Sequence, residues 1–241
     1  MCAIHQPNLF PRLSTLAKLF AADRWIVLDD VQFTRRDYQH RARLAALDDP
    51  GRQQWLTFPT NLAHGRATTI SQARLVDPGR SRRTAELLVR QYYGRSRHWC
   101  AVREVLDAVL YTLDTTDRVA HVTRTSTIAL LTALGWSGDV LDSSDIPTRR
   151  GRSERLADLA AATGSTHYLC GTGGLSYLDV GPFEARAIPV LSFHTPVDTG
   201  DPLWQWARRI SSLWALSQIG PEALGNRLTA QREARLLVPR V

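Results

Sequence analysis

The opening segment constrains the fold more than any other part of the sequence. A short apolar run ends at His5-Gln6-Pro7. Because proline cannot continue the hydrogen bonding of a strand, the chain must turn there and expose the imidazole and the carboxamide at a sheet edge. Pro11 then suits the first turn of a helix. One apolar face of that helix is formed by Leu13, Leu16, Leu19 and Phe20.

A second apolar run, residues 25–28, completes a strand, helix and strand unit. Strands joined by a crossover helix almost always run parallel, so the loops after both strands emerge at the same carboxyl edge of the sheet. The second loop carries Asp29, Asp30 and Gln32. We therefore expect these side chains to converge with the imidazole and the carboxamide.

The remaining pattern predicts an α/β fold with a largely parallel, Rossmann-like sheet and C-terminal helices. Apolar residues recur at helical spacing between about residues 80 and 135, which predicts a helical insertion. Asp77-Pro78-Gly79 is typical of a turn before it. We expect residues 1–241 to form one domain. Further strands are predicted at residues 53–59, 70–76, 140–141, 168–170 and 188–193.

Residues 34–44 are polar and are predicted to form a loop that presents Arg35, Arg36 and Arg41 beside the carboxylates. Bidentate guanidinium groups match phosphates or carboxylates, although solvated surface charge explains the same pattern.

Two other motifs follow predicted strands. Ser143 and Ser144 could bind phosphate through their hydroxyl groups, or could cap the next element. The turn that contains Gly171, Gly173 and Gly174 allows close backbone approach to a ligand and offers N–H donors. It has neither the lysine of a P-loop nor the spacing of a dinucleotide fingerprint.

These motifs, taken in order, resemble the WbqC-like protein family. The resemblance rests on His5-Gln6-Pro7-Asn8-Leu9-Phe10-Pro11, Leu28-Asp29-Asp30-Val31-Gln32-Phe33, Trp55-Leu56-Thr57-Phe58-Pro59 and Tyr168-Leu169-Cys170-Gly171 with Tyr177. It implies a role in O-antigen or natural-product biosynthesis, with acyl or aminoacyl groups placed on amino sugars or other amines. It also implies substrate-binding roles for Asn8, Gln32, Trp55 and Tyr177. The family often has serine in place of Cys170 and asparagine in place of His40, differences that bear on the substrate.

The charge and the cysteine content limit the kinds of partner and metal site that we expect. The formal net charge is +7, Lys18 is the only lysine, and the arginines are spread along the chain. We therefore expect no nucleic-acid binding, but rather an anionic partner such as a nucleotide or the phosphopantetheine arm of a carrier protein. The three cysteines have no metal-binding spacing. We expect no metal, no membrane span and no secretion signal, hence a cytoplasmic protein.

Amide formation needs a base for the ammonium proton and donors for the developing oxyanion. We expect His5 to be the general base, Asp29 or Asp30 to orient it or the amine, and Gln6 or the glycine-turn amides to hold the oxyanion. The predicted activity is an amide-forming acyltransferase that uses a carrier-protein or other thioester donor, a small-molecule amine acceptor and no cofactor.

Several alternatives remain open. Cys170 could carry a covalent acyl group. An ATP-dependent ligase or a nucleotidylyltransferase of the HUP type, with ATP and Mg²⁺, would use the same sheet edge, although the second histidine of its motif is absent. A non-catalytic binding module would form no product. A metal hydrolase could use His5, Asp29 and Asp30 with His40 or His194. The sequence specifies neither donor, acceptor nor oligomeric state.

Overall fold

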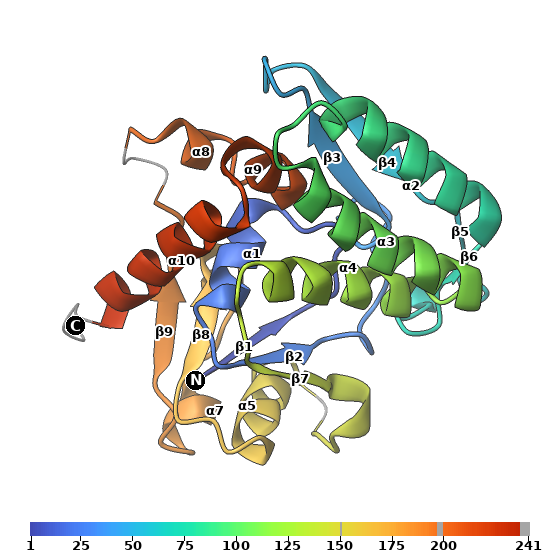
Figure 1. Ribbon diagram of the computed structural model, residues 1–241. Coiled ribbons are helices and arrows are strands. Elements are labelled where there is room, and N and C mark those ends of the chain that lie inside the picture. The colour runs from blue at the N-terminus through green and yellow to red at the C-terminus, as the bar shows by residue number, and fades with distance from the viewer. Residues whose placement is uncertain (150, 197–199, 237–241) are drawn as a thin grey trace.

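A five-stranded parallel sheet lies at the centre of the computed structural model, which describes residues 1–149, 151–196 and 200–236 (Figure 1). Its strands stand in the order β7-β2-β1-β8-β9, and every neighbouring pair is parallel. This confirms the predicted α/β, Rossmann-like fold. The strands are β1 (Cys2–His5), β2 (Arg24–Val27), β7 (Asp139–Asp142), β8 (Tyr168–Gly171) and β9 (Val190–Phe193).

The strand order places a topological switch between β1 and β8. The chain builds outward from β1 to β2 and β7, then returns to the other side of β1 with β8 and β9. Since crossovers are right-handed, the two directions of growth put their helices on opposite faces. Helix α1 (Leu13–Phe20) covers one face and α5 (Arg152–Ala162) the other (Figure 1). Loops after β1 and β8 diverge at the switch and leave a crevice, the usual ligand site of such sheets.

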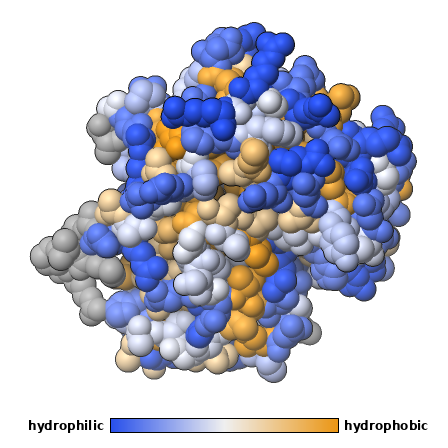
Figure 2. Space-filling view, viewed as in Figure 1, coloured by the Kyte–Doolittle hydropathy of each residue, from blue (hydrophilic) through white to orange (hydrophobic). Residues whose placement is uncertain are grey.

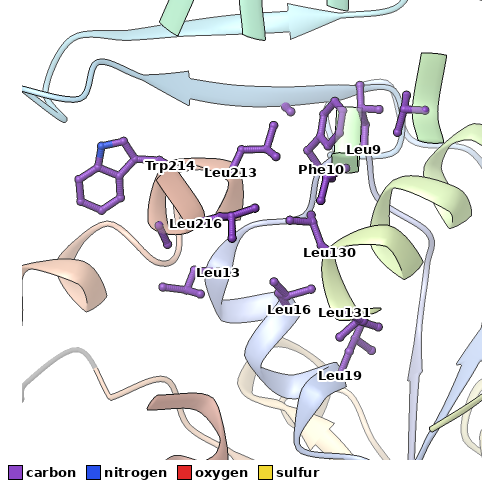
Figure 3. Packing of buried hydrophobic residues seen from close by; sticks show 14 of the residues in the cluster. Leu9, Phe10, Leu13, Leu16, Leu19, Leu130, Leu131, Leu213, Trp214 and Leu216 are labelled. Carbon is purple, nitrogen blue, oxygen red and sulfur yellow. The ribbon is translucent and has the colours of Figure 1, made fainter. Parts of the chain in front are cut away.

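Helix α1 is fixed by leucine packing on several sides (Figure 3). Its leucines lie among those of α4 (Val119–Ala133) and α9 (Ser212–Ile219), and all belong to one buried cluster. The side chains concerned are Leu13, Leu16 and Leu19 of α1, Leu130 and Leu131 of α4, and Leu213 and Leu216 of α9. The helix is therefore held from two other helices as well as from the sheet.

Helices fill the predicted insertion between β2 and β7. They are α2 (Pro78–Tyr93), α3 (Trp99–Thr115) and α4. The predicted turn at Asp77-Pro78-Gly79 proves instead to be the start of α2. The Asp77 carboxylate accepts a hydrogen bond from the Arg80 N–H at 2.7 Å, and proline occupies the first turn, where its missing N–H costs nothing.

The prediction of a loop over residues 34–44 was wrong at its carboxyl end. Strand β3 (Arg41–Ala45) pairs antiparallel with β4 (Gln53–Thr57). Ala42 and Leu44 are fully buried while Arg41 and Arg43 are half-buried, which is the alternation of a strand with one covered face.

The other elements are short or lie near the carboxyl end of the chain. Only part of the predicted strand at residues 70–76 is a strand. These elements are β5 (Thr60–Asn61), η1 (Gly65–Ala67), β6 (Arg74–Leu75), η2 (Ser143–Asp145), α6 (Thr172–Leu175), α7 (Gly181–Glu184), α8 (Pro202–Gln205) and α10 (Pro221–Leu236).

The face shown in Figure 2 is mainly hydrophilic, with apolar side chains visible in strips between charged ones. Among the described residues, no helix combines the length and apolar character needed to cross a membrane.

Candidate functional site

A cavity of about 460 Å³ opens at the switch point, where β1 and β8 end. His5 and Gln6 enter it from the end of β1, and the glycine turn enters it from the end of β8. It is called the switch-point cavity below. Its polar and glycine lining comprises His5, Gln6, Arg12, Ser14, Thr15, Lys18, Asp37, Cys170, Gly171, Thr172, Gly173, Gly174, Thr195 and Arg208.

The tautomer of His5 follows from its hydrogen bond. Nδ1 lies 2.7 Å from the carbonyl oxygen of Gln6, and because a carbonyl can only accept, Nδ1 carries the proton. Burial lowers the pKa of His5 well below its usual value, and the positive charge of Lys18 lowers it further. At neutral pH the ring is therefore neutral, with the lone pair on Nε2 available to take a proton.

The carboxamide of Gln6 is oriented through a relay that begins at a backbone N–H. Thr34 N–H donates to Oε1 of Gln39 at 2.8 Å, so the other amide atom of Gln39 is the NH₂ group. That group donates to Oε1 of Gln6 at 2.8 Å. The Nε2 group of Gln6 is thus the end that remains free to donate. Gln39 is fully buried, so this orientation is enforced.

The loop that follows Gln6 is held by hydroxyl groups of α4. The carbonyl oxygen of Asn8 lies 3.0 Å from Oγ of Ser126 and 3.1 Å from Oγ1 of Thr127, and Phe10 N–H donates to Ser126 at 3.0 Å. Phe10 adopts a φ of 39°, a conformation that a bulky residue keeps only when its surroundings enforce it. Asn8, predicted to bind substrate, is itself buried in this loop, and its side chain donates to the Pro7 carbonyl.

The glycine turn forms the short helix α6, and its glycines lie in the cavity wall. A Cβ on Gly174 would stand 2.8 Å from Sγ of Cys170, closer than side-chain atoms approach. Cys170 is almost completely buried, and burial raises the pKa of its thiol. A buried thiol that resists ionisation is a poor nucleophile, which disfavours the covalent route through Cys170.

Sequence reasoning missed the cationic lining of this cavity. Lys18 on α1 is buried, and its ammonium group lies 3.4 Å from the carbonyl oxygen of Ile4. Arg12 and Arg208 contribute two more cations, against the single carboxylate of Asp37 in the lining. The signal in the sequence was a lone lysine among the leucines of a largely apolar helix.

A second cavity of about 810 Å³ adjoins the first. The two cavities share one wall, and Gln6 belongs to that wall. The shared residues are Ile4, Gln6, Leu28 and Tyr168. The second cavity is also lined by the predicted residues Asp30 and Gln32, and by arginines that sequence reasoning did not single out, Arg149, Arg152 and Arg155.

The aspartates lie differently from the arrangement expected for orienting His5. Asp30 pairs with Arg155 of α5 and accepts from the Ser143 hydroxyl, while Asp29 lies 3.4 Å from that hydroxyl. Ser144 lies 3.5 Å from the other Asp29 oxygen. In the described part of the chain neither carboxylate is hydrogen-bonded to His5, and the Gln6 carbonyl takes the orienting position instead. Burial, then the charges of Asp142 and Asp30, raise the pKa of Asp29.

The predicted arginines lie outside both cavity linings. Arg35 and Arg36 are exposed, and the guanidinium of Arg41 stacks 4.3 Å above the ring of Trp55. Tyr177 is exposed beside the second cavity, with Arg152 at 4.9 Å from its ring. Throughout residues 1–149, 151–196 and 200–236, no three His, Cys, Asp or Glu side chains are grouped as metal ligands.

Comparison with known proteins assigns the sequence to a family. Residues 6–210 match the sequence pattern of the WbqC-like protein family. The chain belongs to that family. The match covers most of the chain and all of the residues that line the two cavities except Ile4 and His5. The WbqC-like chain is also 27% identical over 191 residues to the uncharacterized protein Rv1507c of Mycobacterium tuberculosis, over 79% of this chain and 80% of that protein. No solved structure was found to match it.

Proposed function

We propose that this WbqC-like protein is a biosynthetic acyl- or aminoacyltransferase that forms an amide on an amine acceptor, with His5 as the general base. The observation that carries the proposal is the neutral imidazole with a free Nε2, beside an oriented Gln6 carboxamide that lines two adjoining cavities. Two cavities that share the wall at Gln6, one of which is also lined by His5, suit a reaction between two substrates.

The proposed step balances through one proton. Nε2 of His5 takes a proton from the attacking amine as its nitrogen bonds to the acyl carbon of a thioester. Nε2 of Gln6 donates to the oxyanion of the tetrahedral intermediate. The carbon–sulfur bond then breaks, and the imidazolium returns its proton to the departing thiolate. The products are an amide and a free thiol.

The donor and acceptor are assigned by chemistry. The acceptor is a small-molecule amine, an amino sugar or a natural-product intermediate. The donor is an acyl or aminoacyl thioester, carried by a carrier protein whose phosphopantetheine phosphate is anionic. Arg12, Lys18 and Arg208 line the switch-point cavity and suit such an anion. The exposed Arg35 and Arg36 could steer an acidic carrier protein from outside.

Mass spectrometry of acceptor products, with a panel of carrier-bound thioesters and candidate amines, tests the proposal. Amide product should form without ATP, and His5→Ala should reduce its rate about 10²-fold or more. His121→Ala, which removes an exposed histidine on α4, is the matched control and should keep the full rate. Undiminished turnover by a folded His5→Ala protein would exclude the imidazole as the base.

A second candidate is an ATP-dependent amide ligase or nucleotidylyltransferase. The observation in its favour is the strand order, whose switch point is the usual site of nucleotides in doubly wound sheets. This reading requires product formation only with ATP and Mg²⁺, together with release of AMP or pyrophosphate. Running the same thioester assay with and without ATP separates the two candidates.

A further inference from the structure

Lys18 stands out as a buried cation without an acidic partner. It is the only lysine in the chain, and 6% of its surface is exposed. Its only recorded hydrogen bond is the 3.4 Å contact with the Ile4 carbonyl. Across the described residues, every recorded ion pair uses an arginine or the N-terminal ammonium, and none uses Lys18.

The groups next to this ammonium are neutral or positive, and Asp37, the carboxylate in the cavity lining, forms no recorded ion pair with it. From β1 it faces His5 and Cys2, from β8 it faces Cys170, and Arg12 precedes its own helix. Burial lowers the pKa of Lys18 to about 8, so the side chain is still mainly charged at neutral pH. An ammonium has three N–H donors, and only one has a recorded acceptor. The protein therefore keeps a cation that its own groups do not satisfy.

The unsatisfied donors lie beside open space and not inside packed core. Lys18 lines the switch-point cavity together with Arg12 and Arg208. A Cβ built on Gly171 would lie 3.6 Å from Cδ of Lys18 and 4.0 Å from its Nζ, so the lysine reaches the turn after β8. Its Nζ is thus within reach of both the end of β1 and the glycine turn.

We propose that Lys18 binds an anionic group of a substrate, a phosphate or a carboxylate, at the base of the switch-point cavity. This assigns a substrate class to the cavity used in the proposed function, and rests on that function only for the identity of the whole substrate. An oxyanion would supply the missing acceptors and the missing negative charge together.

The single lysine allows a direct measurement on the intact protein. Protein grown with ¹³Cε-labelled lysine should give one lysine signal, which can be titrated with pH and with inorganic phosphate or acetate. A bound anion should shift the signal saturably and raise the Lys18 pKa by about one unit, which corresponds to tenfold stronger anion binding by the charged form. Saturation by phosphate alone or by acetate alone identifies the group. A signal unaffected by both anions would overturn the proposal.

Variants separate a specific site from general positive charge. In calorimetric titrations Lys18→Met should weaken binding of the effective anion about tenfold or more, while Lys18→Arg should retain part of it. Arg66→Gln removes one exposed charge outside the cavity lining and should have no effect. Equal loss in Lys18→Met and Arg66→Gln would contradict a specific site.

The outcome is distinguishable from that of the proposed function. If thioester substrate leaves an acyl group on Lys18, detected by peptide mass spectrometry, the lysine is a nucleophile and the binding role is overturned. Anion binding without any amide product would instead leave Lys18 as proposed and remove the transferase. Amide formation that depends on His5, with a Lys18 signal that does not respond to either anion, would support the transferase and overturn the role of Lys18.

Discussion

At the scale of single residues, the candidate site depends on groups that never enter it. Gln39 lines neither cavity, yet its hydrogen bond to Gln6 decides which end of the Gln6 carboxamide is free. The orientation is fixed by the Thr34 N–H, which can only donate and therefore faces the oxygen of the Gln39 amide. A side chain of the same shape without an NH₂ group would reverse the orientation of the Gln6 carboxamide.

The substitution Gln39→Glu is expected to reverse the orientation of the Gln6 carboxamide. The carboxylate would still accept from Thr34, but it would require a donor from Gln6, so Gln6 would turn its NH₂ group away from the reacting carbonyl. Loss of one oxyanion donor costs about 10²-fold in kcat. Steady-state kinetics should show that loss in kcat with KM little changed. Gln91→Glu, exposed on α2, is the control, and a normal kcat in Gln39→Glu would refute the relay.

The buried ammonium of Lys18 should destabilise the protein. Its pKa falls from 10.5 when exposed to about 8 in the folded chain. The unfolded state therefore binds more protons between these values, so stability rises with pH across that window, and the full penalty of about 3 kcal/mol applies below pH 8. Lys18→Met, similar in volume, should raise the free energy of unfolding at pH 7 by about 1–3 kcal/mol while weakening anion binding.

Denaturant unfolding of both proteins from pH 7 to pH 10 measures this difference. The stability gain of Lys18→Met should shrink as the pH rises, because wild-type Lys18 loses its charge. A gain that stays constant with pH, or a loss of stability at pH 7, would contradict an unpaired buried charge.

At the scale of elements, α4 acts as a support for the loop after β1. The helix lies in the insertion between β2 and β7, yet its hydroxyl groups meet the Asn8 carbonyl. The helical insertion therefore takes part in positioning His5 and Gln6, although it contributes no side chain to either cavity.

Removing both hydroxyls should loosen that loop. In Ser126→Ala with Thr127→Val, the buried Asn8 carbonyl and the Phe10 N–H lose their partners, which costs about 2–4 kcal/mol of unfolding free energy. Turnover should fall as well, because the loop carries the reacting groups. Chemical denaturation and kinetics measure both effects. Thr132→Val, exposed on the same helix, should change stability by less than about 0.5 kcal/mol. If the double variant and Thr132→Val showed the same stability and turnover, α4 would not support the loop after β1.

Elements with strong internal periodicity could be predicted from sequence, and those that depend on a partner could not. The helices between β2 and β7 carry their own pattern and were found. Strand β3 was missed because Arg41 and Arg43 look like loop residues until β4 covers Ala42 and Leu44. Propensity yields to tertiary burial at such edges.

At the scale of the whole molecule, the strand order decides which predicted residues meet. Sequence reasoning placed the groups after β1 and β2 at one edge of the sheet. It could not show that Asp30 would turn toward α5, because that contact depends on Arg155 approaching from a distant part of the chain. Nor could it show that Lys18 is buried, since that burial depends on β1 and on the turn after β8, which is distant in sequence.

The division into two cavities leads to a kinetic prediction for the whole molecule. If each cavity holds one substrate, Arg208→Gln in the switch-point cavity should raise KM for one substrate about tenfold, and Arg152→Gln in the second cavity should raise KM for the other. Both should leave kcat within about threefold, because neither arginine adjoins His5 in sequence or shares its recorded hydrogen bonds. Two-substrate initial-rate measurements test this, with Arg66→Gln as the charge-matched control. If both variants raise KM for the same substrate, the cavities form one extended site, and the acceptor must bind elsewhere.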